Sequence, residues 1–261
     1  MAQFMRDPEV VLAEIIAIQE PWRNSFKDDT HHLVKQTHDL YYLFEAETGA
    51  RARVCLFISK KMALGTHIVH SADCQEYQIK TEEQELRIIN IYNKGGTLAM
   101  NDLEQILRRI SYLVIGDFNL HHPAWGGDGA SQDLGSDDLL DQIDIAGLDL
   151  WLRPGTTIWR RGGEAGLQET TIDLVLASYA LRERMIACET KERIHADSDH
   201  LPILTTLEIN TPKILETRRR QWKKMDISKF IKFVSENLKN KLWMHSPELI
   251  NESINHLLDI V

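Results

Sequence analysis

The feature of this sequence that most restricts its fold is a series of short apolar runs rich in β-branched residues. Their lengths are typical of strands rather than of helices. The runs are residues 14–18, 53–59, 86–92, 112–116, 172–177 and 203–207. Between these runs, two segments have helical periodicity. Residues 101–110 begin with Asn101 and Glu104, which can cap a helix N-terminus. Residues 138–146 end before Gly147, where a left-handed C-cap would lie. Strands outnumber helices, so the sequence predicts a layered α+β or α/β domain.

Polar residues stand at the ends of five of these runs. They are QE at 19–20, YN at 92–93, DFN at 117–119, TID at 171–173 and SDH at 198–200. Each one alone fits a turn or a helix cap, because Asp and Asn are common in turns. In an extended segment, however, residues i and i+2 share a face, so Asp117 and Asn119 can point into one volume. Five such ends in one chain predict a site at the edge of a rigid sheet.

Composition limits the class of protein. The chain has 261 residues, 43% of them hydrophobic, which suffices for one large domain or for a domain with an appendage. There is no apolar run of about eighteen residues, and the N-terminus lacks the pattern of a signal peptide. The three cysteines form no CxxC pair, which argues against a disulfide framework or a zinc ribbon. We expect an intracellular protein with no membrane partner.

Charge is distributed unevenly along the chain. The net charge of −9 argues against a polyanionic partner, but carboxylates that hold a metal would also make the balance acidic. Between Lys213 and Lys224, six basic residues stand against one Glu216. Such a stripe can contact phosphates, or it can be a solvated linker. We predict a folded domain over residues 1–212, followed by a basic linker and helical connector over 213–261.

The ordered motifs carry a family resemblance. The series QE, IYN, GDFN, TID and SDH resembles the endonuclease/exonuclease/phosphatase superfamily, which includes apurinic endonucleases, DNase I and inositol polyphosphate phosphatases. GDFNLHHPAWGG and TIDLVLAS followed by SDHLPI are most similar to the endonuclease domain of LINE-type non-LTR retrotransposons. The resemblance covers residues 1 to about 210. It implies a DNase I-like α+β fold: a four-layer α/β/β/α sandwich of two mostly antiparallel sheets flanked by helices.

The sequence departs from the family pattern at its start. The family begins with a strand that carries an asparagine into the site, followed by a helix and the QE strand. Here no asparagine precedes Asn24, and no strand precedes Glu14. We therefore expect an N-terminally truncated domain that lacks an interior strand, which would expose strand edges and leave an apolar gap.

The resemblance assigns metal ligands to particular residues. Glu20 would bind a divalent metal, Asp199 would help to hold it or a second ion, and Asp117 would be a ligand or the base beside the attacking water. Mg²⁺ (or Mn²⁺) is the expected ion, since Mg²⁺ prefers oxygen ligands and keeps several waters.

The same resemblance assigns the catalytic residues. Asn119 and Tyr92 would donate hydrogen bonds to phosphate oxygens. His200 would contact the scissile phosphate or act as general base, and Asp173 would accept its other ring N–H and fix the tautomer.

Three functions remain open from the sequence. The first is a Mg²⁺-dependent endonuclease that nicks DNA in the nucleus and works with a downstream reverse transcriptase absent from this chain. The second is a phosphatase of the same superfamily that acts on a small phosphate or a lipid headgroup. The third is an inactive remnant that binds nucleic acid or a partner through residues 213–261.

Several residues near the motifs have simpler explanations. His121 and His122 fit no metal-ligand spacing, so loop packing is the preferred interpretation. Trp125 is predicted to anchor a loop, with stacking on a base as the alternative. The pair Arg160-Arg161 is equally consistent with contact to a DNA backbone and with solvation.

Overall fold

The computed structural model describes residues 3–21, 32–43, 49–62, 65–96, 111–163, 166–194, 198–210 and 228–229. The chain divides into two compact units, Met1–Ile214 and Leu215–Val261. The predicted helix at residues 101–110 and nearly all of the predicted connector lie outside the described residues. No helix in the described ranges has the length and apolar character that crossing a membrane requires.

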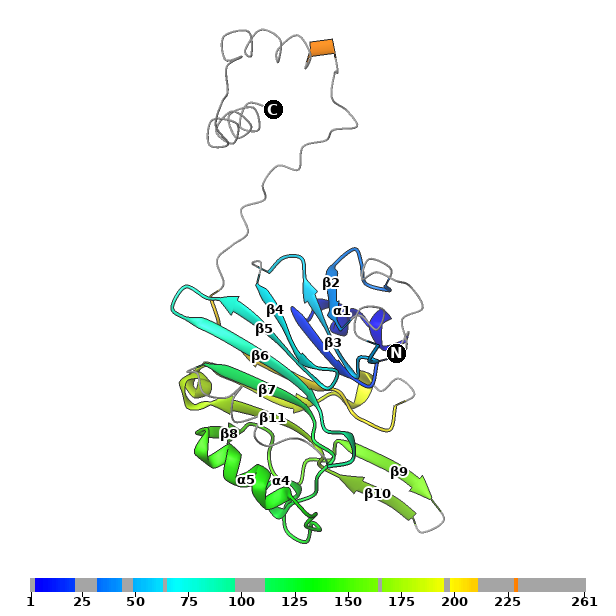
Figure 1. Cartoon of the computed structure of the whole chain (residues 1–261). Coiled ribbons are helices and arrows are strands. Elements are labelled where there is room, and N and C mark those ends of the chain that lie inside the picture. The colour runs from blue at the N-terminus through cyan, green and yellow to red at the C-terminus, as the bar shows by residue number, and fades with distance from the viewer. Residues whose placement is uncertain are drawn as a thin grey trace. The chain divides into compact units, whose positions relative to one another are not determined.

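Two sheets form the body of the first unit (Figure 1). The smaller sheet has the order β1-β3-β2, with both pairs antiparallel. Its strands are β1 (Ile15–Gln19), β2 (His38–Tyr42) and β3 (Val54–Ser59). The larger sheet has the order β4-β5-β6-β7-β11-β8, in which β6 and β7 form the one parallel pair. Its strands are β4 (Thr66–Ser71), β5 (Cys74–Lys80), β6 (Glu85–Tyr92), β7 (Tyr112–Asp117), β8 (Leu148–Leu150) and β11 (Asp173–Ser178).

Shorter elements complete the fold. Two separate strand pairs are β9 (Trp159–Gly163) with β10 (Gly166–Thr170), and β12 (Met185–Thr190) with β13 (Ile203–Leu207). The α-helices described are α1 (Pro8–Leu12), α4 (Pro123–Gly126) and α5 (Ser136–Ile145). Short 3₁₀ turns are η1 (Phe4–Arg6), η2 (Lys94–Gly96), η3 (Tyr179–Arg184) and η4 (Glu192–Ile194).

Alternation along the strands explains the layers. In β3, Leu56 and Ile58 face the core between the two sheets, whereas Cys55 and Phe57 pack against the α1 side. In β11, Val175 faces the core between the sheets, and its neighbours pack on the opposite face with α5. Because successive strand residues point to opposite faces, each sheet contributes to two cores. Three cores between four layers give the predicted α+β sandwich, with α1 outside one sheet and α4 and α5 outside the other (Figure 1).

The apolar runs found in the sequence all became strands. They correspond to β1, β3, β6, β7, β11 and β13, with shifts of a residue at some ends. The helix predicted at 138–146 is α5, and Gly147 follows it with φ +62°. The strands that the sequence did not indicate are β2, β4, β5, β8, β9, β10 and β12. The missing first strand stays a prediction.

Candidate active site

Sheet register places three of the predicted residues in one row. The parallel pairing of β6 with β7 sets Tyr92 opposite Asp117, and the antiparallel pairing of β7 with β11 sets Asp117 opposite Asp173. Residues opposite each other on paired strands share a face and are close neighbours. The row therefore follows from backbone pairing alone.

Gly116 permits this close approach. A Cβ at this position would lie 2.0 Å from the carbonyl oxygen of Ile91 on β6. Any side chain would push the two strands apart directly before Asp117. The glycine of the GDFN motif therefore has a packing function that its position in a strand did not reveal.

His200 completes a cluster with the two carboxylates. One ligand atom from each of Asp117, Asp173 and His200 lies within 4.8 Å of the others. The Nδ1–H of His200 donates to Asp173 Oδ2 at 2.9 Å, as the resemblance implied for this pair. A single β-bridge between Trp159 and His200 fixes the backbone of the SDH motif against β9. Because Nδ1 is engaged by Asp173, the Nε2 atom is the ring nitrogen that can face a substrate.

The electrostatics of this cluster shift the three pKa values upward. Burial, and then the negative charge of Asp173, raise the pKa of Asp117 to about 7. Burial also raises the pKa of Asp173, against the hydrogen bond from His200. Burial alone would lower the pKa of His200, but Asp173, Asp117 and Asp199 raise it to about 9. The cluster therefore favours the protonated form of each of these three groups.

Backbone strain marks two of the predicted residues. Glu20 (φ 48°) and Asn119 (φ 49°) are the non-glycine residues with positive φ in the described part of the chain. Asn tolerates this left-handed conformation, but for Glu it costs about 1–2 kcal/mol. The backbone N–H of Asn119 donates to Asp117 Oδ1 at 2.9 Å, which holds the turn beside the cluster. Strain of this kind is retained where the surrounding structure enforces it, often at functional sites.

Glu20 lies next to the Tyr92 end of the row. Burial, together with a hydrogen bond and the charge of Glu20, raises the pKa of Tyr92 to about 12. The charge of Asp117 acts on the same phenol, so both carboxylates lie within electrostatic reach of it. Glu20 is therefore close to Tyr92, although it is not one of the three cluster residues.

Asp199 lies at the margin of the site. It is exposed, and its Oδ2 accepts a hydrogen bond from Trp159 Nε1 at 2.8 Å. Its charge reaches Asp173 and His200, but it does not belong to the three-residue cluster. The structure thus gathers Tyr92, Asp117, Asp173 and His200 more closely than it gathers Asp199, whose role as a metal ligand stays a prediction.

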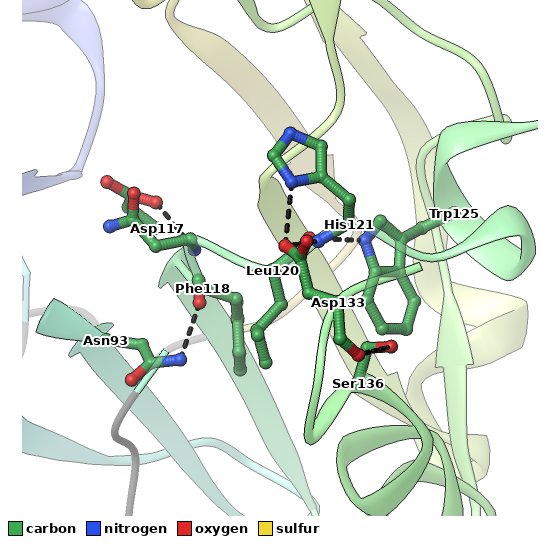
Figure 2. Close-up of polar contacts among 9 residues, drawn as sticks. Asn93, Asp117, Phe118, Leu120, His121, Trp125, Asp133 and Ser136 are labelled. Carbon is green, nitrogen blue, oxygen red and sulfur yellow. Dashed lines mark hydrogen bonds and ion pairs between the residues drawn. The ribbon is translucent and has the colours of Figure 1, made fainter. Parts of the chain in front are cut away.

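The loop after Asn119 is fastened by polar contacts (Figure 2). Asp133 Oδ2 accepts from both the backbone N–H and the Nδ1–H of His121, each at 2.8 Å. His122 Nδ1 accepts from Ala124 N at 3.0 Å and so caps α4. These contacts agree with loop packing for both histidines. Asp133, which lies 12 residues from His121, carried no signal in the sequence.

Trp125 anchors this loop in the core. Its side chain is 1% exposed, and its Nε1–H donates to the carbonyl oxygen of Leu120 at 2.8 Å (Figure 2). A ring buried to this extent has no face open to a base. The stacking alternative for Trp125 is therefore wrong.

Replacement of Trp125 tests the anchoring hydrogen bond. We expect Trp125→Phe to lower the free energy of unfolding by about 1–3 kcal/mol, because the Leu120 carbonyl loses its partner while most of the ring area remains. Urea unfolding followed by circular dichroism measures the change. A loss within error of zero would show that the bond does not hold the loop.

Asn93 lies beside the site, although the sequence motifs assign no role to it. It is 1% exposed, its backbone N–H donates to the Asp117 carbonyl at 2.8 Å, and its Nδ2 donates to the Phe118 carbonyl at 2.6 Å (Figure 2). Asn93 thus stabilises the GDFN turn through hydrogen bonds to the backbone carbonyls of Asp117 and Phe118. Its place directly after Tyr92 at a strand end was the available signal.

Arg160 and Arg161 lie on β9, beside the site. The Arg160 guanidinium pairs with Glu192 at 3.3 Å, and its backbone N–H donates to the Asp199 carbonyl at 2.8 Å. These contacts stabilise the hairpin next to the SDH motif. Contact with a DNA backbone stays a prediction for both arginines.

Comparisons with known proteins show similarity in sequence family and in fold. Residues 86–204 match the family model described as Endonuclease-reverse transcriptase. The endonuclease domain of TRAS1, a telomere-specific non-LTR retrotransposon, matches with a TM-score of 0.60 at 13% identity, over 79% of this chain and 91% of that one. The chain has a DNase I-like fold. The fold that the motifs implied is confirmed.

Two further solved structures have a similar fold. The catalytic domain of Xenopus laevis APE2 matches with a TM-score of 0.59 at 16% identity, over 80% of this chain and 87% of that one. The 3′ phosphatase NExo from Neisseria, bound to a product DNA hairpin, matches with a TM-score of 0.55 at 14% identity, over 74% of this chain and 88% of that one. Among curated proteins, no sequence matches the chain.

The donor atoms of the site fit a hard divalent cation. Asp117 and Asp173 supply carboxylate oxygens, and Asp173 Oδ1 is buried with no hydrogen-bond partner. Two buried carboxylates side by side repel each other, which is why the pKa of Asp117 is raised. A bound cation would offset this charge, and oxygen ligands of this type suit Mg²⁺ or Mn²⁺.

Proposed function

We propose that the chain is a divalent-metal-dependent phosphodiesterase that nicks DNA, as the endonuclease of a non-LTR retrotransposon. The row of Tyr92, Asp117 and Asp173, closed by His200, is the observation that carries this proposal. The match of residues 86–204 to an endonuclease and reverse transcriptase family supports the retrotransposon context. A nuclear location and a downstream reverse transcriptase follow from the same proposal.

The side chains of the site can each take a separate role in hydrolysis of the phosphodiester. Asp117 accepts the proton of a water whose oxygen bonds to phosphorus, while the bond from phosphorus to the leaving ribose oxygen breaks and that oxygen takes a proton from solvent. His200, protonated and held by Asp173, donates from Nε2 to a phosphate oxygen. Tyr92 and Asn119 donate to other phosphate oxygens and orient the group.

A divalent cation would be held by carboxylates of Glu20 and Asp117, with the free Oδ1 of Asp173 as a further oxygen donor and Asp199 at the margin. Bound there, it would stabilise the negative charge that develops on the phosphate oxygens. It would also lower the pKa of Asp117 and keep that group ionised.

A second function has a specific observation in its favour. One of the superfamily structures similar to this chain is a 3′ phosphatase. The same cluster could remove a terminal phosphate, because both reactions hydrolyse a phosphate ester at one phosphorus atom. The two functions differ in substrate, so one assay with two substrates separates them.

Supercoiled-plasmid nicking by the purified chain tests the proposal. We expect nicking with Mg²⁺, none with EDTA, and a loss of about 10²–10⁴-fold in His200→Ala, because a positioned proton donor is removed. His67→Ala, on the edge strand β4, is a matched histidine control and should retain activity. A 3′-phosphorylated oligonucleotide measures phosphatase activity in parallel.

The outcomes separate the three functions. Nicking that requires metal and His200 supports the endonuclease. Release of phosphate without nicking favours the phosphatase. Silence on both substrates, with salt-dependent DNA binding retained, would leave the inactive remnant.

A further inference from the structure

An ion pair lies next to the part of the site that contains Glu20 and Tyr92. Its two partners accept hydrogen bonds from the backbone N–H groups of these residues. Arg53, just before β3, points its Nε and Nη2 at the two carboxylate oxygens of Asp73 in a bidentate contact. Ala72 and Asp73 form the turn between β4 and β5. The side chains are 31% and 27% exposed, so the pair is half-buried. It joins the residue before β3 of the smaller sheet to the turn between β4 and β5 of the larger sheet.

The backbone of each partner holds one predicted site residue. The carbonyl oxygen of Arg53 accepts from the backbone N–H of Glu20 at 2.8 Å. The carbonyl oxygen of Asp73 accepts from the backbone N–H of Tyr92 at 2.8 Å. In addition, the backbone N–H of Arg53 donates to the Ala72 carbonyl at 2.7 Å. The distance between Glu20 and Tyr92 is thus set through residues 53, 72 and 73.

Two further observations tie the pair to the site. Glu20 has a φ of 48°, a conformation that needs external support in a residue other than glycine. The hydrogen bond to Asp73, with added effects of Tyr92 and Glu20, raises the pKa of Arg53, so the guanidinium lies within electrostatic reach of both site residues. An arginine also suits this place because its planar fork binds a carboxylate in one fixed orientation, which lysine cannot do.

We propose that Arg53 and Asp73 are positioning residues that hold Glu20 and Tyr92 in register across the two sheets. This inference rests on the proposed function of the site. Neither residue needs to touch substrate, since each acts through the backbone of its neighbour. The pair is a unit, so loss of either partner should have the same effect as loss of both.

Kinetics of the full chain measures the effect on catalysis. We expect Arg53→Gln, Asp73→Asn and the double variant each to lower kcat for nicking by about 10- to 100-fold, because a small displacement of site groups is enough. KM for DNA should change by less than about threefold. Arg184→Gln is the matched control: its guanidinium contacts Glu83 with 33% of the side chain exposed, at the opposite end of the large sheet's β6. The control should keep the wild-type kcat.

Mn²⁺ binding gives a readout that does not depend on activity. By electron paramagnetic resonance, Arg53→Gln and Asp73→Asn should bind Mn²⁺ about 10-fold or more weakly, since Glu20 loses its orientation. Arg53→Lys, which keeps the cation but not the fork, should show the same loss if Arg53→Gln does not fold. Mn²⁺ affinities and kcat values equal to those of the wild type and of Arg184→Gln would overturn the inference. Should the wild type fail to nick DNA, the proposed function fails, and the Mn²⁺ affinities still decide this inference.

Discussion

Asp117→Asn is expected to abolish nicking and, at the same time, to stabilise the metal-free protein. Activity should fall by about 10²–10⁴-fold, because the amide cannot accept a proton from water. The free energy of unfolding in EDTA at pH 8 should rise on the order of 1–3 kcal/mol, since a buried charge beside Asp173 is removed. The amide oxygen still accepts from the Asn119 N–H, so the turn is preserved.

The sign of this effect follows from the raised pKa of Asp117, about 7 in the folded protein against an ordinary value of 3.8. A folded state that binds the proton more tightly than the unfolded state is favoured at low pH. The metal-free protein should therefore lose stability as pH rises from about 4 to about 7. His200, with its pKa raised from 6.5 to about 9, adds stability that is complete below pH 6.5 and lost as pH rises through 9.

Urea unfolding in EDTA at pH 5, 7, 8 and 9 measures both contributions. The wild type should weaken at each step, whereas Asp117→Asn should weaken little between pH 5 and 7. Asp128→Asn, an exposed carboxylate in the same loop region, is the matched control and should follow the wild type. If Asp117→Asn and the wild type were equally stable at pH 8, the charge of Asp117 would not destabilise the folded protein.

The parts of the fold that could be predicted are those with apolar alternation. The run at residues 172–177 divides its side chains between two cores, and that division is what its sequence pattern encodes. β4 and β5 gave no such pattern, because THIVHS and CQEYQIK are mostly polar. β5 is nevertheless buried along most of its length, and its buried Glu76 is paired with Gln78 on the same strand and with Arg87 on β6. Hydrophobic periodicity cannot detect a strand that buries paired charges.

The residues of the site also divide into those that could be predicted from the sequence and those that could not. Strand ends with polar residues predicted Tyr92, Asp117 and Asp173, because register brings neighbouring strand ends together. The contacts of Arg53 with Asp73 and of His121 with Asp133 connect loops across 20 and 12 residues of sequence. No local sequence pattern indicates such pairs, because the two partners come together only when the chain has folded into sheets.

Glu76→Gln is expected to cause a large loss of stability away from the site. Glu76 is fully buried on β5, and both of its carboxylate oxygens contact the guanidinium of Arg87 on β6. His70 Nε2 and Gln78 Nε2 donate to it as well, at 2.9 Å and 2.7 Å. Removing one partner of a buried ion pair costs about 3–5 kcal/mol, because the other charge is left without compensation. Urea unfolding at pH 7 measures this loss.

The effect should depend on pH in a defined direction. Burial alone would raise the pKa of Glu76, but His70, Arg87 and Gln78 lower it to about 2 from an ordinary value of 4.5. The stability that this carboxylate contributes is complete above pH 4.5 and is lost as pH falls through 2. The difference between wild type and Glu76→Gln should therefore shrink as the urea titrations move from pH 7 to pH 3.5.

Asp39→Asn serves as the control for Glu76→Gln, because Asp39 is 53% exposed and pairs with Lys60 at 3.4 Å. An exposed pair of this kind contributes about 0–1 kcal/mol. The double change Glu76→Leu with Arg87→Met should restore most of the stability, since apolar side chains of similar volume can replace a buried pair at little cost. A Glu76→Gln loss no greater than that of Asp39→Asn would mean that the buried pair does not hold β5 to β6. Nicking per folded molecule should be unchanged in all these variants, because Glu76 lies opposite Ile89, three residues before Tyr92 on β6.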